Sequence, residues 1–328
     1  MKVIVPVAGK GTRLRPHTHT KPKSLVRVAG KPILGHLIDR IRTLPMDELI
    51  LIIDPDESKE ASIRQFLDAT APVPVRYVRQ TELKGPAHAI FLAREYIDQD
   101  VLIIFNDTLF DADLDQIQTH QSDGMIWVRE VEDPRRFGLI ELEANRIVRL
   151  VEKPEVPPSN LAMIGMYYLK DGPGLMQRIE RVMREGRTVK GEFYLPDPLQ
   201  LMIDEGYHLE AASVQGWYDC GTIEALLDTN RVLLEHGHQK AIDTIESVII
   251  PPVCIEEGAL IRRSVIGPYV SIASQTIVEH SIIRDSILNE GASVHDALLQ
   301  RSLIGEQAFV KGGYKRLNVG DSSVVQGE

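Results

Sequence analysis

The segment between Gly9 and Lys23 has the residue types of a phosphate-binding loop. It reads GKGTRLRPHTHTKPK and combines two glycines with five lysine and arginine side chains. A glycine-rich turn lets backbone N–H groups approach phosphate oxygens without an intervening side chain. The segment contains neither the G-K-[ST] of a Walker loop nor the G-x-G-x-x-G of a dinucleotide fingerprint. It therefore predicts binding of an anionic small molecule by a different kind of loop.

A carboxylate, Asp107, ends the apolar run DVLIIFND. In an open α/β sheet, ligands bind beyond the carboxyl ends of the strands, and carboxylate oxygens there suit a divalent cation. The position of Asp107 therefore predicts a metal ligand.

Alternating strands and helices must position these groups. Apolar runs predict buried strands at residues 2–8, 48–54, 73–80 and 100–107, and amphipathic patterns predict helices at 31–44, 57–68 and 85–97. The alternation indicates an α/β fold with a mostly parallel sheet and helices on both faces.

After about residue 240 the sequence repeats with a short period. The segments SVII, SVIG, SIIR and ALLQ begin at residues 247, 264, 281 and 297, at separations of 17, 17 and 16. This spacing predicts a left-handed parallel β-helix of about four coils. Branched apolar side chains recur here every five or six residues, and a sandwich of ordinary strands would not keep that spacing. Those side chains are Ile249, Ile255, Ile261, Ile266, Ile272, Ile277, Ile283, Leu288, Val294, Leu299, Ile304 and Val310. We expect two domains, residues 1–240 and 241–328.

The complete spacing from Gly9 to Lys23 resembles the signature of the sugar-1-phosphate nucleotidylyltransferases, G-x-G-T-R-L-x-P-x-T-x-x-x-P-K, at every fixed position. The resemblance implies that the first domain has the family's Rossmann-like fold. It also implies that Arg13 and Lys23 bind a nucleoside triphosphate, whereas Lys10, Arg15 and Lys21 occupy variable positions with supporting or solvent roles. Further nucleotide-binding residues implied here are Ala8, Gly9, Gly11 and Thr12.

The segment RQTELKGPAHAI resembles the family's base-reading loop, Q-x-x-x-x-G-x-A. The resemblance implies that the Gln80 side chain and the Gly85 backbone bind a pyrimidine. An amide offers the acceptor and donors that match uracil or thymine. Guanylyl-transferring relatives tend to carry Glu at the position of Gln80, so uridylyl or thymidylyl transfer is favoured. The alternative is that Gln80 caps its own loop. His88, at a variable position, is expected to pack.

A second metal carboxylate is implied at Asp219, in GWYDCGT, which with Asp107 would bind Mg²⁺. Mg²⁺ prefers one or two carboxylates together with substrate phosphates. Asn106 stands where the family usually has glycine, and this difference could alter the backbone approach to the nucleotide or sugar.

The sugar end of the site is also inferred from the resemblance. Lys153 is implied to bind the sugar phosphate and Glu152 to accept hydrogen bonds from sugar hydroxyls. Glu192 and Asp197, in GEFYLPD, match a following family segment, and both could equally be caps or hairpin groups. The remaining residues implied in this pocket are Gly138, Asn160 and Gly165, of which Asn160 could equally be a cap or hairpin group.

The resemblance implies in-line attack of a sugar-1-phosphate on the α-phosphorus of dTTP or UTP, giving a nucleotide sugar of the dTDP- or UDP-glucose type and pyrophosphate. The attacking phosphate has a second pKa near 6, so it needs no general base. Two alternatives are a non-catalytic nucleotide-sugar sensor and a bifunctional enzyme whose β-helix is an acetyltransferase using His280 and His295. The choice of sugar and of pyrimidine stays open.

Composition excludes several other classes. The balance of 37 basic and 47 acidic residues, net −10, argues against a nucleic-acid or anionic-membrane binder. The sequence has no apolar run of membrane-spanning length, and the apolar N-terminal segment is too short for a signal peptide, so a cytoplasmic protein is expected. Cys220 and Cys254 are too few for a disulfide framework or a zinc site. The β-helix favours a role in homo-oligomer assembly or as an allosteric surface.

Overall fold

The computed structural model describes residues 1–326 and divides the chain into two compact units. The first unit contains Met1–Gly9 and Leu37–Trp217. The second contains Lys10–His36 and the chain from Tyr218 onward. These units divide the chain by its internal contacts and do not follow the expected boundary at residue 240. That domain boundary stays a prediction.

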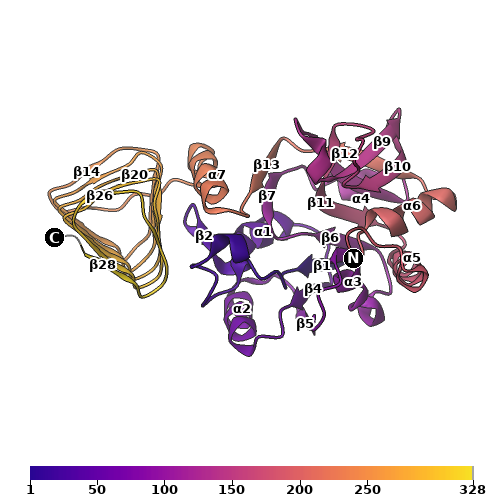
Figure 1. The fold of residues 1–328 in the computed structure, drawn as a ribbon, viewed down its shortest axis with the longest axis horizontal. Helices are drawn as coiled ribbons and strands as arrows, with labels where there is room; N and C mark the ends of the chain where they lie inside the picture. Colours follow the sequence, from indigo (N-terminus) through magenta and orange to yellow (C-terminus); the bar gives the residue numbers. More distant parts are fainter. Residues whose placement is uncertain (327–328) are drawn as a thin grey trace. The chain divides into compact units, whose positions relative to one another are not determined.

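The first unit is built on a nine-stranded mixed sheet (Figure 1). Its strands, in order across the sheet, are β5 (Val75–Arg79), β4 (Glu48–Ile53), β1 (Lys2–Pro6), β6 (Val101–Ile104), β11 (Leu161–Leu169), β8 (Gly124–Glu130), β12 (Leu209–Ser213), β10 (Arg146–Glu152) and β9 (Gly138–Glu143). A further strand of this unit is β7 (Thr108–Asp111), and β13 (Gly216–Asp219) runs from the first unit into the second.

The parallel part of the sheet confirms the four predicted strands. β1 pairs in parallel with β4 and β6, and β4 pairs in parallel with β5. All residues of β4 and β6 are buried, as continuous apolar runs predict for parallel strands covered on both faces. Phe105, Asn106 and Asp107 therefore follow β6 at a carboxyl edge of the sheet.

The other part of the sheet is largely antiparallel. β11 pairs antiparallel with β6 and β8, and β10 pairs antiparallel with β9 and β12, whereas β12 runs parallel to β8. Glu152 lies at the last position of β10, opposite Gly138 at the first position of β9. The antiparallel pairing therefore places two predicted sugar-pocket residues side by side.

The helices of this unit pack on the sheet and on one another. α3 contacts β1 and α5, and α6 contacts α5 and β10. The predicted helix at 85–97 is shorter than expected, because α3 ends at Phe91 and a 3₁₀ turn follows. The helices and 3₁₀ turns are α2 (Glu57–Thr70), α3 (Pro86–Phe91), η3 (Arg94–Tyr96), α4 (Gln116–Thr119), η4 (Pro134–Arg136), α5 (Gly172–Glu185) and α6 (Pro196–Asp204).

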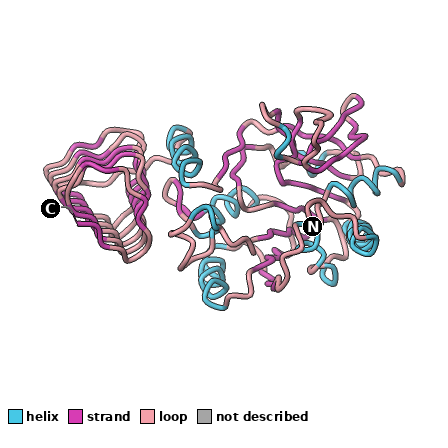
Figure 2. Tube along the Cα trace, in the orientation of Figure 1, coloured by secondary structure: helices cyan, strands magenta, loops and turns pink. Residues whose placement is uncertain are grey.

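The second unit contains a triangular coil of three five-stranded parallel sheets, consistent with a left-handed β-helix (Figures 1 and 2). The first sheet is β14 (Val248–Ile249), β17 (Val265–Ile266), β20 (Ile282–Arg284), β23 (Leu298–Gln300) and β26 (Tyr314–Lys315). The second is β15 (Val253–Ile255), β18 (Val270–Ile272), β21 (Ser286–Leu288), β24 (Leu303–Ile304) and β27 (Asn318–Val319). The third is β16 (Leu260–Arg262), β19 (Ile277–Glu279), β22 (Ser293–His295), β25 (Phe309–Lys311) and β28 (Val324–Gln326).

The register confirms the period read from the sequence. Val248 pairs with Val265, Val265 with Ile282, and Ile282 with Leu298. Two details differ from the expectation. Ile277 is 36% exposed and its neighbour Val278 is fully buried, because Val278 pairs with the buried Ile261. Each sheet also has a fifth strand, so the helix extends beyond the expected four coils.

The N-terminal part of the second unit carries the glycine-rich loop. It forms two 3₁₀ turns, η1 (Thr12–Leu14) and η2 (Lys23–Leu25), and a small antiparallel pair, β2 (Arg27–Val28) and β3 (Lys31–Pro32). α1 (Ile33–Ile41) begins in this unit and ends in the first. α7 (Ile223–Glu235) begins after Thr222, whose hydroxyl accepts a hydrogen bond from the Ala225 N–H at 3.2 Å. No helix within residues 1–326 is long and apolar enough to cross a membrane.

Candidate functional site

Gly11 forms the turn that shapes the glycine-rich loop of the second unit. Its φ of +59° is left-handed, and its carbonyl accepts hydrogen bonds from the Thr18 hydroxyl at 2.7 Å and the Leu14 N–H at 3.0 Å. A Cβ atom at Gly11 would lie 3.0 Å from Thr18 Cγ2 and 3.3 Å from Lys23 Cβ. Glycine is therefore required both by the backbone and by the close approach of the segment that carries Lys23.

Arg13 and Asp219 lie against the same glycine. A Cβ atom at Gly221 would be 2.8 Å from Asp219 Oδ1 and 3.1 Å from Arg13 Nη2. Asp219 Oδ1 also accepts a 2.6 Å hydrogen bond from the Gly221 N–H. Both side chains belong to exposed residues, so a predicted triphosphate ligand and a predicted metal ligand share one exposed corner of the second unit. Thr12, in the same turn as Arg13, is also exposed.

Ala8 and Gly9 follow β1 in the first unit. Ala8 is buried, whereas Gly9 is exposed and a Cβ atom there would meet nothing within 4 Å. The space beside Gly9 fits the predicted backbone contact with a nucleotide.

Gln80 is buried where β5 ends. Its N–H donates to the Ile53 carbonyl at 2.9 Å, and its side-chain Nε2 donates to the Glu82 carbonyl at 3.1 Å. The side chain thus caps its own loop in this conformation, which was the alternative to base reading. A bound pyrimidine would have to replace that bond.

Gly85 joins the predicted base-reading loop to the GEFYLPD segment. A Cβ atom at Gly85 would lie 2.5 Å from the Phe193 carbonyl oxygen, and its φ is +101°. Phe193 donates to the Lys84 carbonyl at 2.8 Å and accepts from the Ala87 N–H at 3.0 Å. The backbone of residues 84–87 is therefore held by the segment that also carries Glu192. His88 is buried, as expected, and burial lowers its pKa.

Lys153 is held between an acid and a phenol. Its ammonium nitrogen lies 3.2 Å from Glu152 Oε1 and donates to the Tyr194 hydroxyl at 3.0 Å. The Tyr194 hydroxyl in turn donates to Glu192 Oε2 at 2.6 Å. Lys153 also has a left-handed φ of +42°, a conformation uncommon for a residue with a side chain.

The charges of this group follow from burial and contacts. Burial raises the pKa of Glu152, and the neighbouring Lys153 opposes the shift without reversing it. Burial alone would lower the pKa of Lys153, but the hydrogen bond with Tyr194 and the charge of Glu152 outweigh it and raise that pKa. Lys153 therefore remains a cation, as a ligand of a sugar phosphate must. Burial also raises the pKa of Asp197.

The remaining sugar-pocket residues lie in different surroundings. A Cβ atom at Gly138 would be 2.8 Å from Glu152 Oε2, so this glycine does permit a close approach to Glu152. Gly165 packs against Phe105, whose N–H donates to the Gly165 carbonyl at 2.9 Å. Asn160 is exposed, and its carbonyl accepts from the Val131 N–H at 3.0 Å.

Asp107 is exposed just after β6, at the carboxyl edge of the sheet where a metal-binding carboxylate was predicted. Asn106 beside it is buried, and its Oδ1 has no hydrogen-bond partner among the described residues. Burial raises the pKa of Tyr167, and the charges of Glu152 and Asp107 act in the same direction. Both carboxylates therefore lie within electrostatic range of one hydroxyl group.

Asp107 and Asp219 have the oxygen donors that Mg²⁺ prefers, and both are exposed. Within residues 1–326, no group of three or more His, Cys, Asp or Glu side chains is placed to hold a metal ion by itself. A site of one or two carboxylates completed by substrate phosphates fits the donors that are present.

The predicted residues are divided between the two units. The first unit holds Ala8, Gly9, Gln80, Gly85, Asp107, Gly138, Glu152, Lys153, Asn160 and Gly165. The second holds Gly11, Thr12, Arg13, Lys23 and Asp219.

Sequence reasoning missed Tyr194 and could not choose between two roles for Lys21. Tyr194 lies within the quoted segment GEFYLPD, but no spacing rule indicated that its hydroxyl would contact Lys153. For Lys21 the sequence left a supporting and a solvent role open, and its 8% exposure and pairing with Glu306 fit the supporting role. Charge alone cannot distinguish a buried lysine from a solvated one.

Residues 2–236 match the family described as nucleotidyl transferase. The chain is 29% identical to a glucose-1-phosphate thymidylyltransferase of Streptomyces griseus, over 99% of both chains. It is 35% identical to a UTP–glucose-1-phosphate uridylyltransferase of Haloferax volcanii, over 66% of this chain and 89% of the relative. A solved UDP-glucose pyrophosphorylase complexed with UDP-glucose superposes with a TM-score of 0.60 at 25% identity, covering 72% of this chain and 98% of that one. The chain belongs to the nucleotidyl transferase family.

Proposed function

We propose that this protein is a sugar-1-phosphate nucleotidylyltransferase that joins dTTP or UTP to glucose-1-phosphate and releases pyrophosphate. The observation that carries the proposal is the fold of the loop around Gly11, which fixes Lys23 beside that glycine and places Arg13 at an exposed corner with Asp219. The relatives named above transfer thymidylyl or uridylyl groups to the same sugar phosphate, as their names state.

The reaction is an in-line substitution at phosphorus. An oxygen of the sugar phosphate forms a bond to the α-phosphorus while the bond to the bridging oxygen of pyrophosphate breaks. Because the phosphate of the sugar is largely ionised at neutral pH, no side chain has to remove a proton. Catalysis then consists of positioning and charge stabilisation.

Each predicted residue has a part in that scheme. Arg13 and Lys23 bind the triphosphate and offset the charge that develops on the leaving pyrophosphate. Lys153, kept cationic by Glu152 and Tyr194, binds the phosphate of the sugar. Mg²⁺, held by Asp107 and Asp219, would neutralise further phosphate charge. The other sugar-pocket residues are Gly138, Glu152, Asn160 and Gly165.

The base is recognised by Gln80 and Gly85. The Gln80 amide exchanges its bond with the Glu82 carbonyl for the edge of a pyrimidine, while the fixed backbone at Gly85 supplies the second contact. Thymine and uracil differ by one methyl group, which a close pocket distinguishes by about 1–3 kcal/mol. The nucleotide preference is therefore a matter for assay.

The imidazoles of the β-helix have acidic neighbours. His295 lies 3.3 Å from Glu279 and 2.7 Å from the Ser293 hydroxyl, and His280 lies 3.8 Å from Asp296. Ser293 and His295 belong to the same strand, β22, whereas each histidine–carboxylate pair joins neighbouring coils. We propose, in place of the acetyltransferase alternative, that the β-helix has a structural role in a cytoplasmic homo-oligomer.

The proposal is tested by a pyrophosphate-release screen of four nucleoside triphosphates against a panel of sugar-1-phosphates with Mg²⁺. We expect release with dTTP or UTP and glucose-1-phosphate. Folded protein that releases no pyrophosphate with any pair would favour the sensor alternative. A parallel assay of radioactive acetyl transfer from acetyl-CoA to a glucosamine phosphate tests the bifunctional one.

A further inference from the structure

The glycine-rich loop is bonded to the last coils of the β-helix through three side chains. His17 Nε2 lies 2.6 Å from Asn318 Oδ1. The Thr20 hydroxyl donates to Asp321 Oδ2, and the Lys21 ammonium donates to Glu306 Oε1. These contacts join residues 285 to 301 positions apart in the sequence, all within the second unit. The loop that carries Arg13 and Lys23 is thus attached to the β-helix.

Asp321 bonds both to the loop and to the preceding coil of the β-helix. While Oδ2 accepts from Thr20, Oδ1 accepts from the Glu306 N–H at 2.7 Å. A Cβ atom on the preceding Gly320 would lie 2.8 Å from Pro16 Cβ, so Pro16 packs directly on this coil. The attachment is therefore steric as well as polar.

Asn230 makes a second attachment further along the N-terminal segment. This residue of α7 is fully buried. Its Oδ1 accepts from the Ala29 N–H at 2.9 Å and from the Ser271 hydroxyl at 2.6 Å, and its Nδ2 donates to the Tyr269 carbonyl at 3.3 Å. One side chain thus joins the N-terminal segment, α7 and β18.

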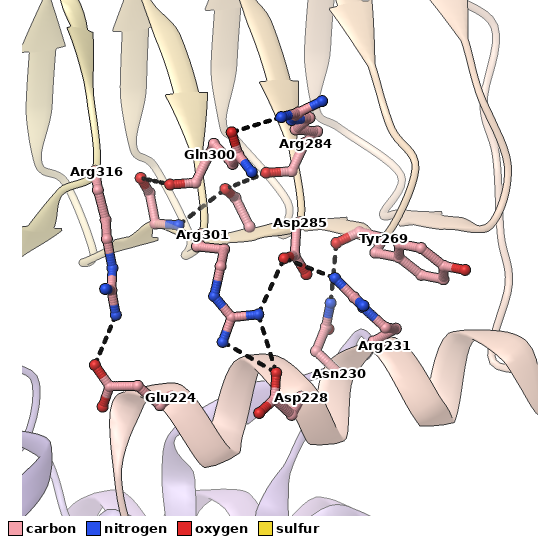
Figure 3. Close-up of polar contacts among 12 residues, drawn as sticks. Glu224, Asp228, Asn230, Arg231, Tyr269, Arg284, Asp285, Gln300, Arg301 and Arg316 are labelled. Carbon is pink, nitrogen blue, oxygen red and sulfur yellow. Dashed lines mark hydrogen bonds and ion pairs between the residues drawn. The ribbon is translucent and has the colours of Figure 1, made fainter.

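α7 is itself fixed to the β-helix by ion pairs (Figure 3). The buried carboxylate of Asp285 lies 2.9 Å from Arg231 Nη2 and 3.2 Å from Arg301 Nη1, and Arg301 also pairs with Asp228 at 3.0 Å. The Thr229 hydroxyl of the same helix donates to the Asp219 carbonyl at 2.8 Å. The β-helix therefore holds the segment of Asp219 through α7.

Burial identifies which of these contacts constrain the loop most. Ion pairs between exposed side chains contribute little, because water competes for both partners. Lys21 is 8% exposed, and a buried ammonium that loses its partner is strongly disfavoured. Removal of the Glu306 carboxylate, which is 41% exposed, therefore leaves the enclosed Lys21 ammonium unpaired and favours movement of the loop into solvent.

We propose that the last coils of the β-helix position the triphosphate-binding loop for nucleotidyl transfer, with Glu306 and Asp321 as positioning residues. The inference rests on the proposed function, in which Arg13 and Lys23 act on the triphosphate. Positioning supplies most of the catalysis in that scheme, so a small displacement of the loop lowers turnover strongly.

The test compares full-length Glu306→Gln, Asp321→Asn and the double variant with the wild type. We expect the double variant to lower kcat about tenfold or more and to leave KM for glucose-1-phosphate within about twofold, because only the triphosphate end is displaced. Amide hydrogen exchange of residues 12–23 should become faster. The matched control is Glu279→Gln, which removes a carboxylate from an earlier coil that pairs with Arg262 and His295. This control should retain wild-type kcat and loop exchange.

A purely structural role would lower the thermal midpoint of the double variant while leaving kcat and loop exchange unchanged at 25 °C, and that result would overturn the inference. Gly320→Ala gives a second route if the charge variants fail to fold, because its methyl group displaces Pro16 without removing any charge; it too should lower kcat. Lys23→Ala distinguishes failure of the positioning inference from failure of the proposed function. If Lys23→Ala is inactive and the positioning variants are fully active, only this inference fails; if Lys23→Ala is itself fully active, the proposed function of the loop fails.

Discussion

The ammonium group of Lys153 donates a 3.0 Å hydrogen bond to the hydroxyl of Tyr194 and lies 4.4 Å from the centre of its ring. The same hydroxyl donates to Glu192. Tyr194 therefore transmits the position of the GEFYLPD segment to the lysine that we assign to the sugar phosphate.

Tyr194→Phe should weaken binding of the sugar phosphate. The substitution keeps the ring beside Lys153 and removes the hydroxyl that orients its ammonium group. A hydrogen bond to a charged group contributes about 1.5–3 kcal/mol, so we expect kcat/KM for glucose-1-phosphate to fall roughly tenfold to a hundredfold. Most of the change should lie in KM for the sugar phosphate, which initial-rate assays at saturating nucleotide measure.

The control for Tyr194 is Tyr207→Phe. The Tyr207 hydroxyl donates to Asp171, at the N-terminus of α5 in the same unit. Loss of that bond should lower the thermal midpoint and leave KM unchanged. Equal KM values for Tyr194→Phe and the wild type would show that the Tyr194 hydroxyl does not orient the phosphate ligand.

Glu152→Gln should stabilise the protein at neutral pH while impairing its activity. Burial raises the pKa of Glu152 above its value of about 4.5 in an unfolded chain. Between those two pKa values the folded state binds more protons, so the free energy of unfolding decreases as pH rises. Glutamine does not ionise, so the variant does not lose stability in this way as pH rises. Its thermal midpoint should exceed that of the wild type at pH 7.5 and approach it at pH 4.5.

The activity of Glu152→Gln should change in the opposite direction, because the carboxylate is assigned to sugar hydroxyls and helps to hold Lys153. We expect a higher KM for glucose-1-phosphate. A thermal midpoint below that of the wild type at pH 7.5 would mean that the ion pair with Lys153, and not burial, dominates the energetics of this carboxylate.

The sequence predicted the β-helix well because its signal is local and repeated. The separations of 17, 17 and 16 residues became the register Val248–Val265–Ile282–Leu298. At Ile277–Val278 two branched residues are adjacent, and the period alone could not decide which one faces inward. The fifth strands were missed because glycine and polar residues dominate after Val310. Among the residues there whose burial the structure describes, only Val319 is apolar and buried.

Contacts between distant segments were beyond the reach of the sequence. Lys21 and Glu306 have no spacing that relates them, and each alone has the sequence appearance of a solvated charge. Gly11, Arg13 and Lys23 were found through their spacing, but the closeness of Arg13 to Asp219 depends on how the second unit folds. The roles of these residues therefore stay predictions from sequence patterns, and the structure shows which contacts hold them.

Lys23→Ala should lower kcat by on the order of a hundredfold to a thousandfold, since it removes a cation that offsets charge on the leaving pyrophosphate. Circular dichroism should show an intact fold, because Lys23 is only partly buried. Lys10→Ala is a matched control within the same loop. Lys10 is exposed at a variable position, and its loss should leave kcat within about twofold. Activity of Lys23→Ala within a few-fold of wild type would refute the assignment of Lys23.

His17→Gln should reduce the acid sensitivity of the second unit. Burial lowers the pKa of His17, opposed by the hydrogen bond with Asn318 and the charge of Asp321 and assisted by the charge of Lys21. The unfolded chain therefore takes up a proton first as pH falls through about 6.5, and stability decreases below that pH until the folded pKa is reached. Thermal midpoints between pH 7.5 and 5.5 should fall less for His17→Gln than for the wild type. Parallel falls would assign the acid sensitivity to other groups.

Gly221→Ala should separate Arg13 from Asp219 without altering any charge. Gly221 does not have a left-handed φ, so the alanine backbone is unstrained and the effect is steric. The added methyl group must displace Asp219 Oδ1, at 2.8 Å, or Arg13 Nη2, at 3.1 Å. Because both groups are assigned to the charged end of the nucleotide, we expect kcat to fall about tenfold or more and the concentration of Mg²⁺ needed for half-maximal rate to rise. KM for glucose-1-phosphate should change little, since Lys153 and Tyr194 are untouched. If kcat and the Mg²⁺ requirement both stay at wild-type values, the contact of these two side chains with Gly221 has no part in positioning them for transfer.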